Sequence, residues 1–114
     1  MLENVRPGMA AFDDEVFGPV MGVIWAENIQ HALDLASHSR LGLGGVIFAE
    51  DVDQAVQMAS QNIDVGWIAV NDFVRSDPRV PFAGSKDSGF ARELGAIGIR
   101  EFVKLKSVVF PVEN

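Results

Sequence analysis

The stretch GGVIFAEDVDQAVQMASQNIDVGWIAVND, at residues 44–72, consists of two short apolar runs with an amphipathic segment between them. The runs are Val46–Ala49 and Trp67–Val70, and their continuous apolar character is typical of strands buried on both faces. Asp51 precedes the middle segment and is a suitable helix N-cap. The apolar positions of that segment recur at helical spacing: Val52, Ala55, Val56, Ala59 and Ile63. This order predicts two parallel strands joined by a right-handed helical crossover.

The same order of elements begins one unit earlier in the chain. Val20–Ala26 is an apolar run rich in β-formers, and it predicts another strand buried on both faces. Asn28 can cap a helix that ends before the glycines Gly42 and Gly44. The apolar face of that helix consists of Ile29, Ala32, Leu33 and Ala36. The sequence therefore predicts an α/β fold, a βαβαβ fragment of a three-layer type of parallel sheet, with both helices on one face and the other face uncovered.

A long glycine-rich loop and a tail complete the chain. The loop is DPRVPFAGSKDSGFARELG, residues 77–95, and it leads into a short helix. Loops of this length in compact domains are usually functional. Phe102–Phe110 then alternates with a rough period of two, which predicts a half-exposed edge strand. We therefore divide the chain into residues 1–101 and a strand and tail at residues 102–114.

The composition excludes several classes of function. The chain has 114 residues, enough for one domain, and 16 acidic against 9 basic residues give a formal charge of −7. This balance argues against nucleic acid and against an anionic membrane surface as partners. Cysteine is absent from the sequence, which excludes a disulfide, a thiolate zinc site and a thiol nucleophile within it. No apolar segment has the length of a signal peptide or a membrane span, so we expect a cytoplasmic protein.

The residues do not fit three other kinds of site. His31 and His38 lie seven residues apart without a third ligand, so we expect solvated side chains and no metal site. The sequence GLGG precedes a strand instead of opening a helix, which favours a structural turn over a dinucleotide loop. A phospho-accepting receiver domain needs an acidic pair after its first strand, whereas Asp13 and Asp14 precede the first predicted strand.

Five motifs, taken in order along the chain, resemble the C-terminal portion of the aldehyde dehydrogenase family. They are EVFGPV at residues 15–20, GLGGVIF at 42–48, WIAVND at 67–72, PFAGSKDSGFARELG at 81–95 and GIREFVKLKSV at 98–108. The resemblance runs from about Asp14 to Val109, and the wording SDPRVPF is most similar to the succinate-semialdehyde dehydrogenase branch. The resemblance implies an NAD(P)-dependent oxidation of an aldehyde to the carboxylic acid. It also implies that residues 102–114 contain an oligomerisation strand.

The resemblance assigns two residues to the cofactor, NAD or NADP. Glu15 corresponds to the acid that accepts hydrogen bonds from the hydroxyls of the nicotinamide ribose, a role that suits a carboxylate. Phe17 corresponds to the aromatic residue that packs against the nicotinamide end. The residues alone would favour a surface acid and a core phenylalanine.

The resemblance assigns the long loop to the wall of the substrate channel. Phe82 matches the channel phenylalanine, and Arg92 matches an arginine associated with subunit contacts and loop order. Ala83 and Ala91 stand where the family usually has glycine, and we expect a slightly altered turn at either alanine, because alanine tolerates positive φ poorly.

Either of two arginines in this loop region could face the carboxylate of a semialdehyde. Arg75 and Arg79 each have a guanidinium group that can bind a carboxylate through two hydrogen bonds. An ordinary surface salt bridge is an equally good interpretation of either arginine.

The family's remaining machinery has no counterpart in these residues. By resemblance the cysteine nucleophile, the general base and the dinucleotide-binding domain all lie upstream of EVFGPV, so we assign no catalytic residue to this chain. We expect the isolated chain to be inactive, and to function as a homo-oligomer or together with the missing N-terminal portion on a small-molecule aldehyde. The alternative is a noncatalytic remnant or a subunit-interaction module.

Overall fold

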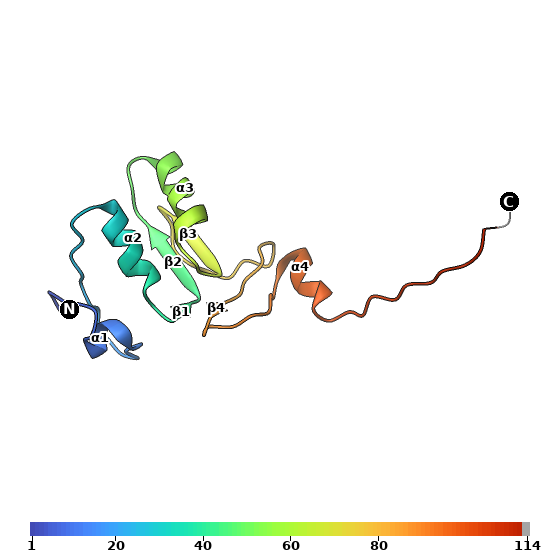
Figure 1. Ribbon diagram of the computed structural model, residues 1–114, viewed down its shortest axis with the longest axis horizontal. Helices are drawn as coiled ribbons and strands as arrows, with labels where there is room; N and C mark the ends of the chain where they lie inside the picture. The colour runs from blue at the N-terminus through green and yellow to red at the C-terminus, as the bar shows by residue number, and fades with distance from the viewer. Residues whose placement is uncertain (113–114) are drawn as a thin grey trace.

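The computed structural model describes residues 1–112, a small α/β unit followed by an extended tail (Figure 1). The helices are α1 (Ala10–Asp13), α2 (Ile29–Ser37), α3 (Val52–Asn62) and α4 (Gly95–Arg100). The strands are β1 (Leu41–Gly42), β2 (Gly44–Ile47), β3 (Trp67–Val70) and β4 (Ser85–Lys86). The predicted α/β class is confirmed.

The central unit is the parallel pair β2–β3, crossed over by α3. Its register runs from Gly44 opposite Trp67 to Ile47 opposite Val70. Asp51 caps α3, because its carboxylate accepts a hydrogen bond from the Gln54 backbone N–H at 2.9 Å. The two strands and the crossover helix predicted from residues 44–72 are therefore confirmed.

The helix α2 begins as its sequence predicts. The Asn28 side chain accepts a hydrogen bond from the His31 backbone N–H at 2.9 Å, which satisfies one of the free donors of the first turn. Side chains from α2, β2 and α3 line one cleft of about 490 Å³ between the two helices. Both helices therefore border the strand β2.

The buried core is small and consists mostly of small side chains. Its apolar members are Val5, Leu33, Ala55, Ala59, Ala69 and Ala83. Ala55 and Ala59 lie on α3 and Ala69 lies on β3, the strand that α3 contacts. Alanines at these positions let the helix lie close to the strand, but they remove little apolar area from water.

The prediction of a first strand at Val20–Ala26 is wrong. This segment forms only an isolated parallel bridge, Gly22 with Leu2, and it is not part of the β2–β3 sheet. The Leu2 N–H donates to the Met21 carbonyl at 2.8 Å, and the Val23 N–H donates to the Leu2 carbonyl at 2.8 Å. Because apolar β-formers specify a strand only where a neighbour pairs with them, this run stays an extended segment with exposed side chains such as Trp25.

The three-layer sheet is not observed in the described residues. Instead of three parallel strands there are two separate two-stranded sheets, β2–β3 and an antiparallel pair β1–β4. In the second pair Leu41 lies opposite Lys86 and Gly42 lies opposite Ser85. This short pair brings the glycine-rich loop back to the end of α2, a connection that the sequence did not reveal.

The prediction of a strand at Phe102–Phe110 is also wrong for the chain by itself. The segment extends away from α4 without a strand partner, and the molecule measures 73 × 32 × 23 Å (Figure 1). Its side chains are exposed, with Leu105 fully so. A single strand cannot satisfy its backbone donors and acceptors without a neighbour. The oligomerisation role of residues 102–114, and the division at residue 101, stay predictions. Among residues 1–112, no helix is both long and apolar enough to cross a membrane.

Candidate functional site

The glycine-rich loop is closed into a hairpin at Phe82 and Glu93. The Phe82 N–H donates to the Glu93 carbonyl at 2.7 Å, and the Glu93 N–H donates to the Phe82 carbonyl at 2.9 Å. The loop and the start of the tail line a cleft of about 400 Å³, whose aromatic side chains are Phe82, Phe90 and Phe102. Phe82, the predicted channel residue, is therefore half-buried in the wall of a cleft.

Serine side chains anchor this loop to β1. The Ser85 hydroxyl donates to the carbonyls of Gly42 at 3.2 Å and Asp64 at 3.0 Å. The Ser88 hydroxyl accepts a hydrogen bond from the Gly42 N–H at 3.0 Å. Both serines therefore hold the loop against Gly42 of β1.

Charged side chains of the same loop segment bind the end of α2. The Lys86 ammonium donates to the carbonyls of Ser37 and Ser39, at 3.0 Å each. These carbonyls lie at the helix C-terminus, where the backbone presents unsatisfied acceptors and favours a cation. Asp87 pairs with Arg40 at 3.2 Å on the surface. The sequence analysis missed these contacts, and the run of four polar side chains SKDS between glycines was the available signal.

The two alanines that replace family glycines fit the loop as it stands. Positive φ among non-glycine residues of the described chain occurs at Asn4, Asn71, Lys86 and Leu94. Neither Ala83 nor Ala91 is in that set, so neither alanine strains the turn. In this region the backbone of Gly66 lies so close to Ala83 that a Cβ at position 66 would overlap the Ala83 carbonyl.

Glu15 and Phe17 lie on the exposed segment after α1. Glu15 borders a cleft of about 770 Å³ that residues 41–46 and Ser88 also line. Phe17 is 91% exposed, which corrects the core position that the residues alone favoured. The structure does not bring Phe17 into the cleft that Glu15 borders. Their assignment to the nicotinamide nucleotide stays a prediction.

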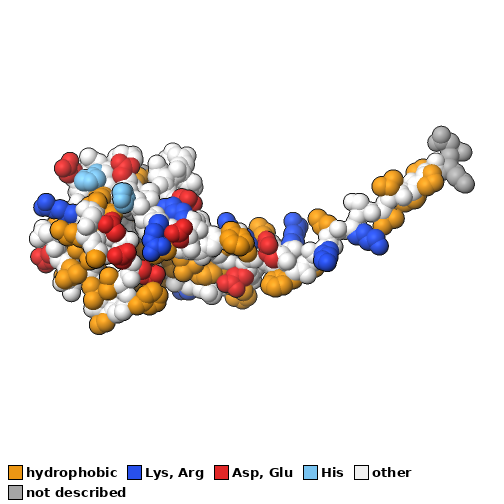
Figure 2. Space-filling view, turned by 60° about the horizontal axis from the view of Figure 1, so that its bottom comes forward, with side chains coloured by type: hydrophobic (Ala, Val, Ile, Leu, Met, Phe, Trp, Pro, Cys, Tyr) orange, Lys and Arg blue, Asp and Glu red, His pale blue; other side chains and the backbone are white. Residues whose placement is uncertain are grey.

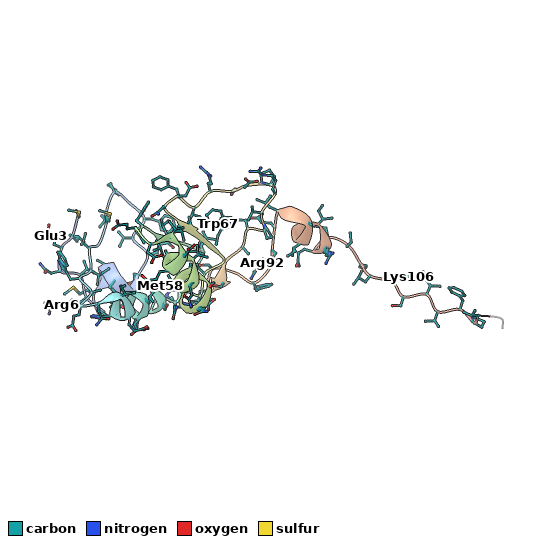
Figure 3. All side chains as sticks on the ribbon, turned by 90° about the horizontal axis from the view of Figure 1, so that it is seen from above. Glu3, Arg6, Met58, Trp67, Arg92 and Lys106 are labelled. Carbon is teal, nitrogen blue, oxygen red and sulfur yellow. The ribbon has the colours of Figure 1, made fainter. Side chains whose placement is uncertain are left out.

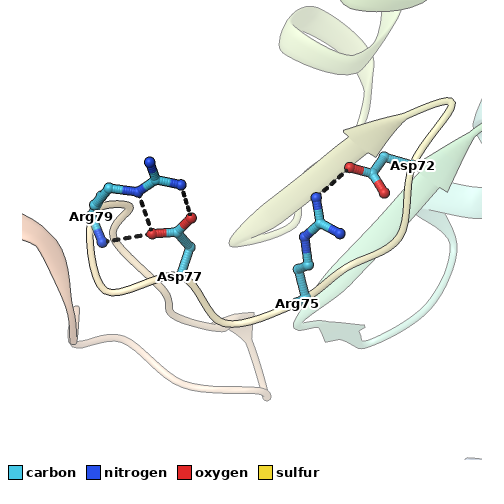
Figure 4. A network of polar contacts seen from close by, with 4 residues as sticks. All are labelled: Asp72, Arg75, Asp77 and Arg79. Carbon is cyan, nitrogen blue, oxygen red and sulfur yellow. Dashed lines mark hydrogen bonds and ion pairs between the residues drawn. The ribbon is translucent and has the colours of Figure 1, made fainter.

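Arg75 and Arg79 both form ion pairs with acids close by in the chain (Figure 4). An Arg75 guanidinium nitrogen lies 2.9 Å from the Asp72 carboxylate. Arg79 binds Asp77 through two guanidinium nitrogens, at 2.9 and 2.6 Å, and its backbone N–H donates to the same carboxylate at 2.9 Å. These hydrogen bonds hold the pKa of Asp77 well below its usual range and raise the pKa of Arg79. The surface salt bridge is therefore observed for both arginines, and their binding of a substrate stays a prediction.

Arg92 is found in Figure 3 between the sheet and α4. Its guanidinium donates to the Ala91 carbonyl at 3.1 Å and reaches the Gly84 carbonyl at 3.5 Å. Both contacts lie within the loop itself, and the predicted roles of Arg92 in loop order and subunit contact stay predictions.

The two histidines have separate surroundings. The His31 Nδ1 accepts a hydrogen bond from the Glu27 N–H at 3.3 Å, and the His38 ring lies 5.5 Å from the Phe12 ring. Within residues 1–112, no group of three or more histidine, aspartate or glutamate side chains is placed to hold a metal ion.

The parallel strands β2 and β3 and the crossover helix α3 define an α/β domain, and the glycine-rich loop is anchored beside the amino ends of the two strands. The model of the aldehyde dehydrogenase family matches residues 1–108, and the chain belongs to that family. Among curated relatives, the NAD(P)+ succinate semialdehyde dehydrogenase of Escherichia coli K12 is 44% identical over 108 residues, covering 95% of this chain and 23% of the relative. A probable NADP+ succinate-semialdehyde dehydrogenase of Synechocystis is 38% identical, covering 95% of this chain and 24% of the relative.

Solved structures of aldehyde dehydrogenases are also similar to this chain. An aldehyde dehydrogenase of Mycobacterium tuberculosis complexed with NAD+ has a TM-score of 0.89 and 35% identity, covering 96% of this chain and 22% of that structure. The betaine aldehyde dehydrogenase of Staphylococcus aureus in complex with NAD+ has a TM-score of 0.83 and 37% identity, covering 88% of this chain and 20% of that structure. The chain thus spans less than a quarter of the length of these relatives.

Proposed function

We propose that this chain forms one wall of the active site of an NAD(P)-dependent aldehyde dehydrogenase that oxidises succinate semialdehyde to the carboxylic acid. The observation that carries this proposal is the 44% identity, over 108 residues, to a succinate semialdehyde dehydrogenase of which those residues are 23%. Because the sequence contains no cysteine, the nucleophile must come from another segment.

The exposed Glu15 and Phe17 fit the nicotinamide end of the cofactor. Glu15 has a free carboxylate at the border of a cleft, and a carboxylate can accept hydrogen bonds from two ribose hydroxyls. Phe17 offers an open ring face that can pack on a flat heterocycle. When bound, NAD(P)+ supplies the hydride acceptor of the reaction. The part of these residues is to orient the nicotinamide ribose and to shield one side of it from water.

The loop residues fit a semialdehyde that has a carboxylate at its far end. Phe82 provides an apolar wall beside the aldehyde chain. Arg79 uses Nε and Nη2 on Asp77, and Arg75 uses Nη2 on Asp72, so each guanidinium keeps further N–H groups for a second carboxylate. Either arginine can therefore bind the substrate without losing its own acid.

A chimera tests the proposal. The corresponding C-terminal part of the Escherichia coli relative is replaced by this chain, and NAD(P)H formation from succinate semialdehyde is measured. We expect a saturable rate in the chimera and none from the isolated 114 residues, which lack the cysteine required for the covalent step. A well-folded chimera without activity, or a protein-dependent rate from the isolated chain, contradicts the proposal.

The second candidate is a noncatalytic module that binds other subunits. The observation in its favour is the amount of exposed apolar surface, which covers parts of the compact unit and follows the tail (Figure 2). Binding of the chain to a subunit without any gain of activity in the chimera would favour this alternative.

A further inference from the structure

The side chain of Asn71 continues the β2–β3 ladder beyond the last backbone pair. The Asn71 backbone N–H donates to the Ile47 carbonyl at 2.8 Å, directly after the final paired residues Ile47 and Val70. Beyond Ile47, the Asn71 side-chain amide pairs with the backbone of Ala49 as a neighbouring strand would. Its Nδ2 donates to the Ala49 carbonyl at 2.8 Å, and its Oδ1 accepts from the Ala49 N–H at 2.9 Å. A primary amide has the donor and the acceptor needed to pair with both groups of one backbone residue.

The backbone at Asn71 turns away from the sheet at the same point. Its φ is 52°, in the left-handed region that asparagine tolerates better than most residues. The segment that follows is fixed in turn by Asp72, whose carboxylate accepts from the Phe73 N–H at 2.8 Å and pairs with Arg75 at 2.9 Å. The Phe73 ring meets Phe48 edge to face, with ring centroids 6.0 Å apart.

Two segments are therefore joined at the carboxyl ends of the parallel strands. One is 48–51, which leads into α3, and the other is 71–75, which holds Arg75. The second segment then returns along β2, where the Val74 side chain lies against Gly44, so a polar clamp at Asn71 fixes the point from which this return to Arg75 begins.

We propose that Asn71 is a positioning residue, whose side-chain amide clamps segment 71–75 to Ala49 and thereby sets the place at which Arg75 is presented. The clamp itself stands on the hydrogen bonds of this chain, whereas its consequence for a substrate carboxylate rests on the proposed function. Asn71 touches neither the aldehyde nor the cofactor in this account. It acts through the backbone of the loop.

Two substitutions separate the two properties of Asn71, its side-chain amide and its positive φ. Asn71→Gly keeps the left-handed backbone and removes the clamp. Loss of two neutral hydrogen bonds corresponds to an exchange of the Ala49 amide proton that is roughly 5- to 30-fold faster, measured by NMR in the full chain. Asn71→Asp keeps the acceptor for the Ala49 N–H and exchanges the donor for an oxygen.

The aspartate variant gives a pH signature that ordinary loss of structure does not produce. A protonated carboxyl can donate to the Ala49 carbonyl and restore both hydrogen bonds, while an ionised carboxylate faces that carbonyl and repels it. The pKa of the new carboxyl is therefore raised above the ordinary aspartate value of about 3.9. The hydrogen bond from the protonated carboxyl therefore stabilises the native loop below that value, and this stabilisation is lost as the pH rises through the raised pKa. Relative to the unsubstituted chain at the same pH, protection of Ala49 should be near normal at pH about 3, where both hydrogen bonds form, and lower at about 7, where only the bond from the Ala49 N–H is kept.

The matched control is Asn62→Asp, since Asn62 is an exposed asparagine whose amide donates to the Met58 carbonyl within α3. It should leave Ala49 protection unchanged at both pH values. Equal protection of Ala49 in Asn71→Gly and the unsubstituted chain, or a pH response shared with Asn62→Asp, overturns the clamp. If Asn71→Asp does not fold at neutral pH, Asn71→Gly still decides the outcome, because it needs no change of pH.

The chimera described above tests the consequence for the substrate separately. We expect Asn71→Gly to raise KM for succinate semialdehyde severalfold more than KM for an aldehyde of similar length without a carboxylate, with a smaller change in kcat. An equal rise in KM for both aldehydes contradicts the proposal that Asn71 sets the position of Arg75. A chimera inactive with every variant contradicts the proposed function, while amide exchange in the full chain still decides the clamp.

Discussion

Asp77 accepts three hydrogen bonds from Arg79, two from the guanidinium and one from the backbone N–H. We predict that its carboxyl titrates well below the ordinary aspartate value of about 3.9, and that Arg79→Gln moves the pKa back toward that value. The lowered pKa means that the pair stabilises the native loop at pH values above about 3.9, and that this contribution is lost as the pH falls through the lowered pKa. Because the Arg79 side chain is 85% exposed, the effect should weaken with salt.

The measurement is an NMR titration of the Asp77 side-chain carbon in both proteins. Arg40→Gln is a suitable control, since it breaks the exposed pair with Asp87 and leaves Asp77 untouched. An Asp77 pKa that is the same with and without Arg79 would contradict the assignment.

Glu15 supplies a second prediction about a single residue, within the active chimera. Glu15→Gln keeps a carbonyl acceptor and removes the charge, so a charge-assisted hydrogen bond to a ribose hydroxyl is lost. Such a bond is worth on the order of 1.5–3 kcal/mol, which corresponds to roughly a ten- to hundredfold lower rate of NAD(P)H formation if the bond persists in the transition state. Glu50→Gln, at another exposed acid, should leave the single-turnover rate unchanged. An unchanged rate in Glu15→Gln would show that the residue has no part in orienting the cofactor.

The crossover helix α3 depends on its cap. Asp51 accepts the Gln54 N–H at 2.9 Å, and α3 (Val52–Asn62) joins the two parallel strands. We predict that Asp51→Ala lowers the free energy of unfolding by about 1 kcal/mol, and that Asp51→Asn restores most of the loss, because asparagine caps nearly as well. Urea denaturation followed by circular dichroism measures both. Equal stability of the alanine and asparagine variants would exclude a capping role.

The elements that the sequence predicted correctly are those with local signals. Asn28 and Asp51 cap the two main helices, apolar residues recur at helical spacing behind them, and β2 and β3 are close enough in sequence for one crossover to pair them. Val20–Ala26 and Phe102–Phe110 have strand-like composition, but a strand depends on a partner that composition does not specify.

The polar contacts of the candidate site escaped sequence analysis for a related reason. Ser85 bonds to a carbonyl 21 residues away, Lys86 to one 49 residues away, and Asn71 to a residue 22 positions away. Such contacts exist only after the chain has folded, so neither spacing nor residue type could locate them. The resemblance to a family supplied the candidate site residues, but it did not show what holds the loop in place.

The molecule as a whole leaves much of its apolar surface in water. Large exposed side chains occur on the compact unit, as at Phe17, Phe73 and Phe90, and also along the tail (Figure 2). The buried apolar residues of the described chain are two larger aliphatic residues and four alanines. They form a small core for a chain of this length. Exposed apolar side chains in this number are typical of a domain that other polypeptide covers.

The tail is the part of that surface with a definite geometry for association. Residues 104–112 are extended and carry no strand partner within the described chain, so their backbone donors and acceptors are open to a neighbour. We predict that the 114-residue chain forms dimers or larger closed assemblies at micromolar concentration. Lys104 and Lys106 repel their counterparts in a continuous stack, which favours closed association over a fibre. Size exclusion with light scattering should show association in the intact chain and its loss in a chain that ends at Glu101. Lys104→Glu with Lys106→Glu is a control that changes charge but keeps the apolar side. A folded monomer from the intact chain refutes the prediction, and equal association without the tail places the contact on the compact unit.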